Sequence, residues 1–120
     1  MILLDTHVLI WSRQSNSPLG PQCLQLIEES LSDGNLAVSA FSFWEVAMLK
    51  DKGRLEVARD IFSWRSSLLE DGLFEIPVDG QIGIRANTLP NFHPDPAARI
   101  IVATALDGPQ LLTADELILR

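Results

Sequence analysis

Short apolar runs alternate with longer segments of helical periodicity along the chain. Each run is bounded by polar residues, which is typical of a β-strand that is buried on both faces. The predicted strands cover about residues 1–5, 36–38, 73–78 and 110–113. The predicted helices cover about residues 6–13, 21–33, 40–52, 57–70, 79–86 and 96–106.

The order of these elements predicts the fold class. Strands that are separated by helices indicate βαβ crossovers, which give a parallel sheet with right-handed connections. We therefore expect an α/β fold in which about four short parallel strands carry helices on both faces. The 120 residues suffice for one domain with a real core, so residues 1–120 are predicted to form a single domain. The order of the strands in the sheet stays open.

Composition excludes several classes of protein. No stretch approaches the roughly 20 apolar residues of a membrane span, and the first residues lack the basic start of a signal peptide, so we expect a cytoplasmic protein. The single cysteine, Cys23, excludes an internal disulfide and a cysteine-built zinc site. The net charge of −7 argues against a conventional basic nucleic-acid binder, but not against a nuclease that reaches phosphates through metal ions.

Acidic residues occupy conspicuous places relative to the apolar runs. Asp5 ends the first run, and Asp115 follows the last one closely. Because the carboxyl ends of parallel strands share one edge of a sheet, the two carboxylates are expected to meet there. Glu45 lies within the otherwise apolar stretch 41–49, where burying an acid is costly unless something binds it. Convergent acids without a nearby base point to a divalent cation.

Each acid also has a purely structural interpretation. Asp5 precedes a helix and fits the N-cap position, a role that is compatible with metal binding. Asp95 is followed by proline, the usual start of a helix, so we interpret Asp95 as a structural cap. A turn after a strand would also favour Asp115. Glu45 fits neither a cap nor the helix dipole. Arg99 would pair with an acid or a phosphate, or is surface charge.

Histidine and tryptophan add little to the site. His7 and His93 lack the paired spacing of zinc ligands, so we interpret them as helix-start and loop residues. Trp11, Trp44 and Trp64 fall within helical patterns and are predicted to be core or interface anchors.

Carboxylates suit one kind of chemistry in particular. Mg²⁺ and Mn²⁺ prefer hard oxygen ligands, and magnesium keeps several waters while using one or two carboxylates. Such a cluster binds a phosphodiester, lowers the pKa of a water molecule and stabilises the leaving oxygen. Hydrolysis of a nucleic-acid backbone needs nothing more elaborate.

Taken together, segments along the whole chain resemble a PIN-domain protein of the VapC toxin type. The resemblance implies a Mg²⁺- or Mn²⁺-dependent endoribonuclease, the toxin half of a toxin–antitoxin pair, with RNA as substrate, a cognate antitoxin as partner and a homodimeric state. Each segment alone is weak evidence, but their order and spacing are specific. The segments are Leu3–Trp11, Val38–Ala40, Trp44–Ala47, Lys52–Leu55, His93–Pro96, Arg99–Ala105 and Leu111–Asp115.

The resemblance also assigns residues to the site. It implies that Asp5, Glu45 and Asp115 form the acidic, metal-binding and catalytic cluster. Four further residues are expected to line this cluster, namely Thr6, Ser39, Arg99 and Thr113.

One position departs from the family pattern. Members carry an acid immediately before the segment that starts at Arg99, where this chain has Ala98. We therefore expect impaired metal binding and cleavage. Ala98 is either a natural loss or an engineered replacement, and we favour the latter because the other elements are intact. The sequence stops at Arg120, where relatives usually continue, so a trimmed end with a less covered sheet edge is expected.

Three other functions compete with the toxin. The first is a PIN-type nuclease with a housekeeping RNA or DNA target, and the second is a binding scaffold that has lost catalysis. The third is a phosphoacceptor receiver domain, but Leu4 stands where a second acid would precede Asp5, and no lysine follows Lys52. We also expect the dimer interface to draw on residues 24–31 and 41–49, because the apolar helix faces of these segments need cover.

Overall fold

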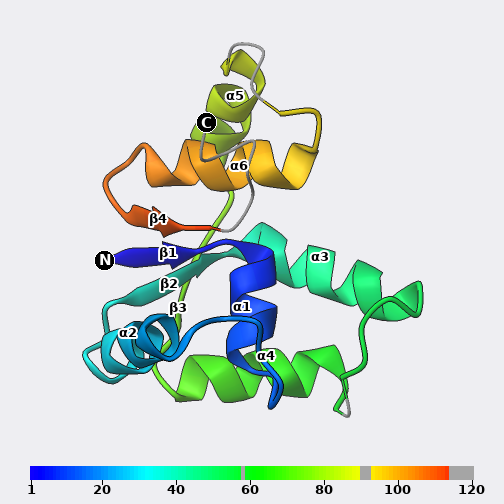
Figure 1. The fold of residues 1–120 in the computed structure, drawn as a ribbon. Coiled ribbons are helices and arrows are strands. Elements are labelled where there is room, and N and C mark those ends of the chain that lie inside the picture. The colour runs from blue at the N-terminus through cyan, green and yellow to red at the C-terminus, as the bar shows by residue number, and fades with distance from the viewer. Residues whose placement is uncertain (58, 90–92, 114–120) are drawn as a thin grey trace.

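In the computed structural model, four short parallel strands form one sheet in the order β3-β2-β1-β4 (Figure 1). The structure describes residues 1–57, 59–89 and 93–113. The strands are β1 (Ile2–Leu4), β2 (Leu36–Ser39), β3 (Phe74–Ile76) and β4 (Gln110–Leu112). The helices are α1 (Thr6–Ser12), α2 (Pro21–Ser32), α3 (Ala40–Asp51), α4 (Ile61–Glu70), α5 (Gly80–Thr88) and α6 (Pro96–Ala105).

The strand order creates a switch point beside β1. The chain moves from β1 through β2 to β3 in one direction, and β4 then pairs with the other side of β1. Leu4 lies opposite both Val38 and Leu112. The residues that follow these three strand positions therefore emerge together at the carboxyl edge, where open α/β sheets bind ligands.

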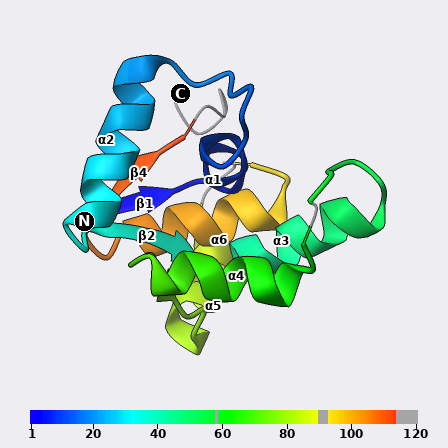
Figure 2. The ribbon, with the colours of Figure 1, turned by 90° about the horizontal axis from the view of Figure 1, so that it is seen from below.

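Helices cover both faces of the sheet, as the sequence predicted. Helices α1, α2 and α4 lie on one face, and α5 and α6 lie on the other (Figures 1 and 2). The alternation along β1 explains this arrangement, because Leu4 belongs to the core under the first group while Leu3 packs with Ile101 of α6. Among the described residues, no helix is long and apolar enough to cross a membrane.

The segment before α4 differs from the prediction. The apolar pattern placed the start of this helix at Val57, but the helix begins at Ile61. Asp60 determines this boundary, because its Oδ1 accepts a hydrogen bond from the backbone N–H of Ser63 at 2.9 Å and so caps the helix. The strand predicted over 73–78 is also shorter, since only Phe74–Ile76 pairs with β2.

The three tryptophans have different environments. Trp64 meets Phe43 edge-on, with ring centroids 6.1 Å apart, and lies partly buried against the main core. Trp11 is half-buried. Trp44, by contrast, is 57% exposed, so of the two predicted roles, core or interface anchor, only the interface role stays a prediction for this residue.

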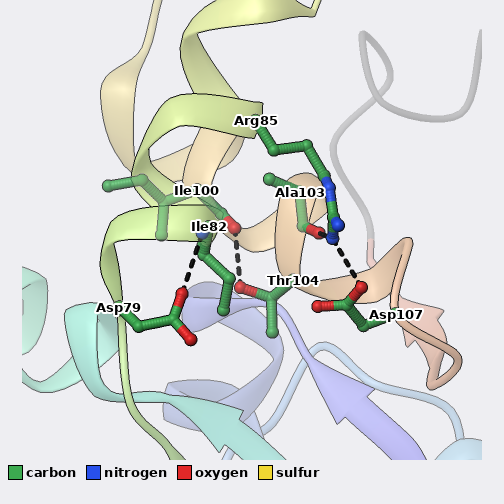
Figure 3. A network of polar contacts seen from close by, with 7 residues as sticks. All are labelled: Asp79, Ile82, Arg85, Ile100, Ala103, Thr104 and Asp107. Atoms are coloured by element: carbon green, nitrogen blue, oxygen red, sulfur yellow. Dashed lines mark hydrogen bonds and ion pairs between the residues drawn. The ribbon is translucent and has the colours of Figure 1, made fainter.

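Helices α5 and α6 are joined into one unit by polar contacts (Figure 3). Arg85 donates from Nη1 to the Asp107 carboxylate at 2.6 Å, which links α5 to the segment after α6. Asp79 caps α5 by accepting from the Ile82 N–H at 2.9 Å. The buried Thr104 hydroxyl donates to the Ile100 carbonyl within α6 at 2.8 Å. Of these contacts, those of Arg85 join the two helices, since it also donates to the Ala103 carbonyl at 3.4 Å, whereas the other two stabilise one helix each.

A two-pronged ion pair fastens α4 to β3 and gives a pH-dependent prediction. Arg65 donates from Nε and Nη2 to the two carboxylate oxygens of Glu75 at 2.7 and 2.8 Å. These hydrogen bonds lower the pKa of Glu75 below its ordinary value of 4.5. Because the folded-state pKa is lowered, the stabilisation is present above pH 4.5 and is lost as the pH falls through the folded-state value. Glu75→Gln should therefore be less stable than the parent chain at pH 7.

The measurement is urea denaturation of both proteins across a pH series. The difference in midpoint should shrink once the pH falls below 4.5 and disappear when Glu75 is protonated in both states. Glu56→Gln, which removes the same charge from an exposed loop residue, controls for net charge. A difference that stays constant at all pH values would contradict the prediction.

Candidate active site

Asp5 stands at the switch point with its carboxylate fixed from two sides. Oδ1 accepts a hydrogen bond from the Thr6 N–H, and Oδ2 accepts one from the Thr113 hydroxyl, both at 2.7 Å. The first bond caps α1 and the second comes from the residue that follows β4. Asp5 is only 8% exposed, so these contacts set the direction of its carboxylate at the sheet edge.

Glu45 faces the same region from the middle of α3. It is half-buried, and burial raises the pKa of its carboxyl above the ordinary value of 4.5. A hydrogen bond with the Thr6 side chain lowers this pKa, whereas the negative charge of Asp95 raises it. His7 lowers the pKa and Asp5 raises it, both by smaller amounts. Glu45 therefore shares one electrostatic environment with groups from the starts of α1 and α6.

A buried hydroxyl pair joins α1 to α3 below these acids. Thr6 Oγ1 lies 2.8 Å from Ser42 Oγ, and both residues are fully buried. A hydroxyl carries one proton, so Thr6 donates to either Ser42 or Glu45 at a given moment. Ser42 was not among the predicted site residues. A serine one helical turn before an acid in an apolar helix is the sequence signal that would have identified it.

Thr6→Val tests how much this pair stabilises the contact between the two helices. Valine keeps the shape of threonine but leaves the buried Ser42 hydroxyl without its partner, so we expect a loss of about 1–3 kcal/mol in the free energy of unfolding. Urea denaturation gives the value. The double variant Thr6→Val/Ser42→Ala is the control, and it should recover part of the loss because neither polar group remains. An additive double variant would contradict the coupling.

Asp95 lies closer to the acids than the sequence suggested. It caps α6 by accepting from the Ala97 N–H at 3.4 Å, as predicted, but its charge also acts on Glu45. Ala98 lies three residues further along α6 and is buried, 4% exposed. Asp95 is the N-cap of α6 in extended conformation, and Ala98 is the third residue of the helix, so both positions lie at the N-terminal end of α6. The three-residue spacing between Asp95 and Ala98 was the sequence signal that could have placed Asp95 near the acids.

Arg99 is engaged by backbone carbonyls. Its Nε donates to the carbonyl of Ala86 at 3.0 Å, Nη1 to that of His93 at 3.1 Å and Nη2 to that of Leu89 at 2.8 Å. The guanidinium thus ties the end of α5 and the following loop to α6. Arg99 therefore stabilises the start of α6 through these contacts. The sequence had left it as a partner for an acid or a phosphate, or as surface charge.

Two predicted site residues remain, Ser39 and Asp115. Ser39 is fully buried at the end of β2, and its Oγ accepts from the Phe41 N–H at 3.1 Å, which caps α3. Asp115 lies outside the residues that the structure describes. The geometry therefore brings together Asp5, Thr6, Glu45 and Thr113 at one edge, with Ser39 at the next strand end.

Comparison with known families decides the identity of this fold. The family model described as "PIN domain" matches residues 2–120. The chain belongs to the PIN domain family. The resemblance found in the sequence is thus confirmed.

Individual relatives agree with the family. The PIN domain chain is 34% identical over 116 residues to "Ribonuclease VapC22" of Mycobacterium tuberculosis, a match that covers 95% of this chain and 86% of the relative. Among solved structures, a chain of a "Toxin-antitoxin complex from Klebsiella pneumoniae" superimposes with a TM-score of 0.66 and 22% identity. That match covers 96% of this chain and 87% of the other, and at this identity it supports the fold.

The oxygen atoms at the sheet edge of this PIN domain fit a hard divalent cation. Each oxygen of Asp5 accepts one hydrogen bond and keeps a lone pair for a further partner. Burial is the largest cause of the raised pKa of Glu45, which indicates a partly desolvated carboxylate. Within residues 1–57, 59–89 and 93–113, no three His, Cys, Asp or Glu side chains are arranged to hold a metal ion. Because Mg²⁺ keeps several waters and uses one or two carboxylates, Asp5 and Glu45 are the described residues suited to hold such an ion.

Proposed function

We propose that this PIN domain is a metal-dependent endoribonuclease that hydrolyses RNA phosphodiester bonds as the toxin of a toxin–antitoxin pair. The observation that carries the proposal is that Thr6 contacts both acids at the switch point of the sheet, because its backbone N–H donates to Asp5 and its side chain hydrogen-bonds the half-buried Glu45. A carboxylate that stays desolvated without a compensating charge is costly, and a bound cation offsets that cost. The name of the Mycobacterium tuberculosis relative, a ribonuclease, supports the reaction class.

The described residues have distinct roles in this proposal. Mg²⁺ or Mn²⁺, when bound, would polarise the phosphate and lower the pKa of an attacking water. Asp5 and Glu45 would hold the ion, and Thr6 and Thr113 orient the carboxylate of Asp5. We assign Asp115, which lies beyond the described residues, as a third carboxylate of the cluster because it follows the last strand.

Ala98 weakens the proposed activity of this chain. A methyl group on the site-facing side of α6 supplies no oxygen for a cation or its waters, so one anchor is missing. We therefore propose a poor nuclease with reduced metal affinity. The non-catalytic binding scaffold remains the second candidate, and this same observation favours it.

Asp5→Asn provides the test of the proposed reaction. Asparagine keeps the oxygen that caps α1 but removes the charge, so the fold should persist. We expect fluorescently labelled RNA to be cut by the parent chain in Mg²⁺ or Mn²⁺, slowly, and by neither Asp5→Asn nor an EDTA-treated sample. Circular dichroism confirms that the variant is folded. Equal cleavage by Asp5→Asn, or cleavage that survives EDTA, would refute the metal-dependent mechanism.

We propose two protein partners. A cognate antitoxin should insert an arginine among the carboxylates, since its planar fork matches them, and lay an apolar segment in a groove. Because Ala98 removes only one acid, this binding should survive in the present chain. Titration of the cognate antitoxin at two salt concentrations tests it. Complete loss of binding, or no effect of replacing the inserted arginine by alanine, would contradict the insertion.

The second partner is another copy of this chain. Large apolar side chains remain exposed, and association would cover some of them. Examples among the described residues are Leu26, Phe62, Ile84 and Leu106. Sedimentation should show a homodimer at micromolar concentration, and a clean monomer would contradict it.

The setting of the activity follows from its substrate. We propose that residues 1–120 act as one domain in the cytoplasm, where the RNA is. A housekeeping RNA or DNA target is the alternative enzyme function. Co-purification of the Ala98→Asp form with bound protein and RNA distinguishes the two, because a toxin should bring a small antitoxin with it.

A further inference from the structure

An exposed ring pair lies beside the acidic site on α3. Trp44 is 57% exposed, and its ring packs against that of Phe41 with centroids 5.0 Å apart and planes tilted by 32°. Phe41 is half-buried and so supports the tryptophan from one side. A large apolar ring that is held in place but left open to solvent is suited to a ligand with a flat face.

Helix geometry places this pair directly next to Glu45. Successive residues of an α-helix are rotated by about 100°. On α3 this puts Glu45 between Ser42, which contacts Thr6 of α1, and the side that carries Phe41 and Trp44. The Phe41–Trp44 ring pair therefore flanks Glu45 on the side away from Ser42.

Aromatic groups also border the site on α1. His7 is exposed at the start of α1, and its charge acts on Glu45. The ring of Trp11 lies 5.8 Å from that of His7, one turn further along the helix. Helix α1, which follows Asp5, and helix α3, which carries Glu45, thus both present aromatic rings next to these acids.

We propose that the Phe41–Trp44 pair is a stacking platform for a nucleobase of single-stranded RNA bound at the acidic site, an inference that rests on the proposed function. A chain with net charge −7 and a carboxylate cluster gains little from attraction to phosphates. Stacking on an aromatic ring does not depend on charge and accepts any base. Because Phe41 already holds the Trp44 ring, little side-chain freedom is lost on binding.

Trp44→Ala and Trp44→Phe test the platform. The probe is a fluorescently labelled oligoadenylate of about ten nucleotides, and its binding is measured by anisotropy in EDTA, so that cleavage does not interfere. We expect Trp44→Ala to weaken binding by about 5- to 150-fold and Trp44→Phe to retain most of the affinity. Phe62→Ala, which removes an 86% exposed ring from α4, is the matched control and should leave affinity unchanged.

A second probe separates stacking from a general loss of structure. In an oligomer whose bases are replaced by abasic sites, the parent chain and Trp44→Ala should bind equally weakly. Equal loss of both probes on mutation, or equal affinity of Trp44→Ala and the parent chain for oligoadenylate, would overturn the platform. Sedimentation identifies the competing occupant, since dissociation of a dimer in Trp44→Ala with unchanged RNA affinity would assign the ring pair to a second copy of the chain.

These results also separate the platform from the proposed function. Failure of the platform leaves RNA binding by the parent chain intact, together with cleavage by the Ala98→Asp form. Failure of the proposed function appears as no cleavage by Ala98→Asp in Mg²⁺ or Mn²⁺, even where Trp44-dependent binding is measured. Absence of RNA binding by every form would overturn both.

Discussion

Ala98→Asp is expected to raise the rate of RNA cleavage in Mg²⁺ or Mn²⁺ by about 10- to 100-fold, the range seen when a partner of a metal site is lost or restored. The new carboxylate would stand three residues after Asp95, the N-cap of α6, whose charge already acts on Glu45. It would also lie in the first turn of α6, where the helix dipole favours a negative charge. Cleavage of labelled RNA under single-turnover conditions measures the change.

Ala97→Asp is the matched control for this variant. Ala97 and Ala98 are adjacent in α6 and equally buried, each 4% exposed, but they point about 100° apart. Ala97→Asp should bring the cost of burying a carboxylate without any gain in cleavage. For Ala98→Asp, added Mg²⁺ should recover thermal stability, because the ion compensates the new charge. Equal cleavage by Ala98→Asp and the parent chain would exclude position 98 from the site.

Glu45→Gln should reduce cleavage by about 100-fold when it is introduced into the Ala98→Asp form, and stabilise the metal-free fold at the same time. Burial raises the pKa of Glu45, so its charged form is a cost to folding at neutral pH. The neutral amide avoids that cost, so we expect a higher free energy of unfolding at pH 7, in keeping with the trade-off between stability and activity at functional sites. Thermal denaturation in EDTA gives the stability change.

The two effects have to be measured together. Glu56→Gln changes the same charge on an exposed loop and should alter neither cleavage nor stability appreciably. Addition of Mg²⁺ should stabilise the protein that retains Glu45 more than Glu45→Gln, because only the former keeps both carboxylates for the ion. If Glu45→Gln instead lowers the stability of the metal-free protein, the carboxylate has a structural role and the interpretation of its desolvation is wrong.

The order and type of the elements followed from the sequence because their causes are local. Apolar runs and helical spacing predicted all four strands and six helices, and proline or capping residues marked several boundaries. The start of α4 was predicted too early, because the apolar pattern already begins before Asp60. The Asp60 cap instead sets the first residue of the helix. The place of Asp5 could also be predicted from the sequence alone, since an acid that follows a buried strand stands at the carboxyl edge of a parallel sheet.

The candidate site needed long-range information. The hydrogen bond from Thr113 to Asp5 joins residues that are 108 positions apart, and it depends on β4 pairing with β1. No local pattern specifies that pairing, because strand order depends on how the crossover helices pack.

Sequence patterning by itself determined which segments fold as helices and strands and which acids follow the strands, since both depend on neighbours along the chain. Tertiary packing decided which side chains meet. It placed Asp95 within electrostatic reach of Glu45, and directed the Arg99 guanidinium to the carbonyls of α5 and its loop. It also left Trp44 open to solvent, although Trp44 falls within a helical pattern just as the half-buried Trp11 and Trp64 do. These outcomes depend on the relative placement of α1, α3, α5 and α6, which the periodicity of each helix alone does not specify.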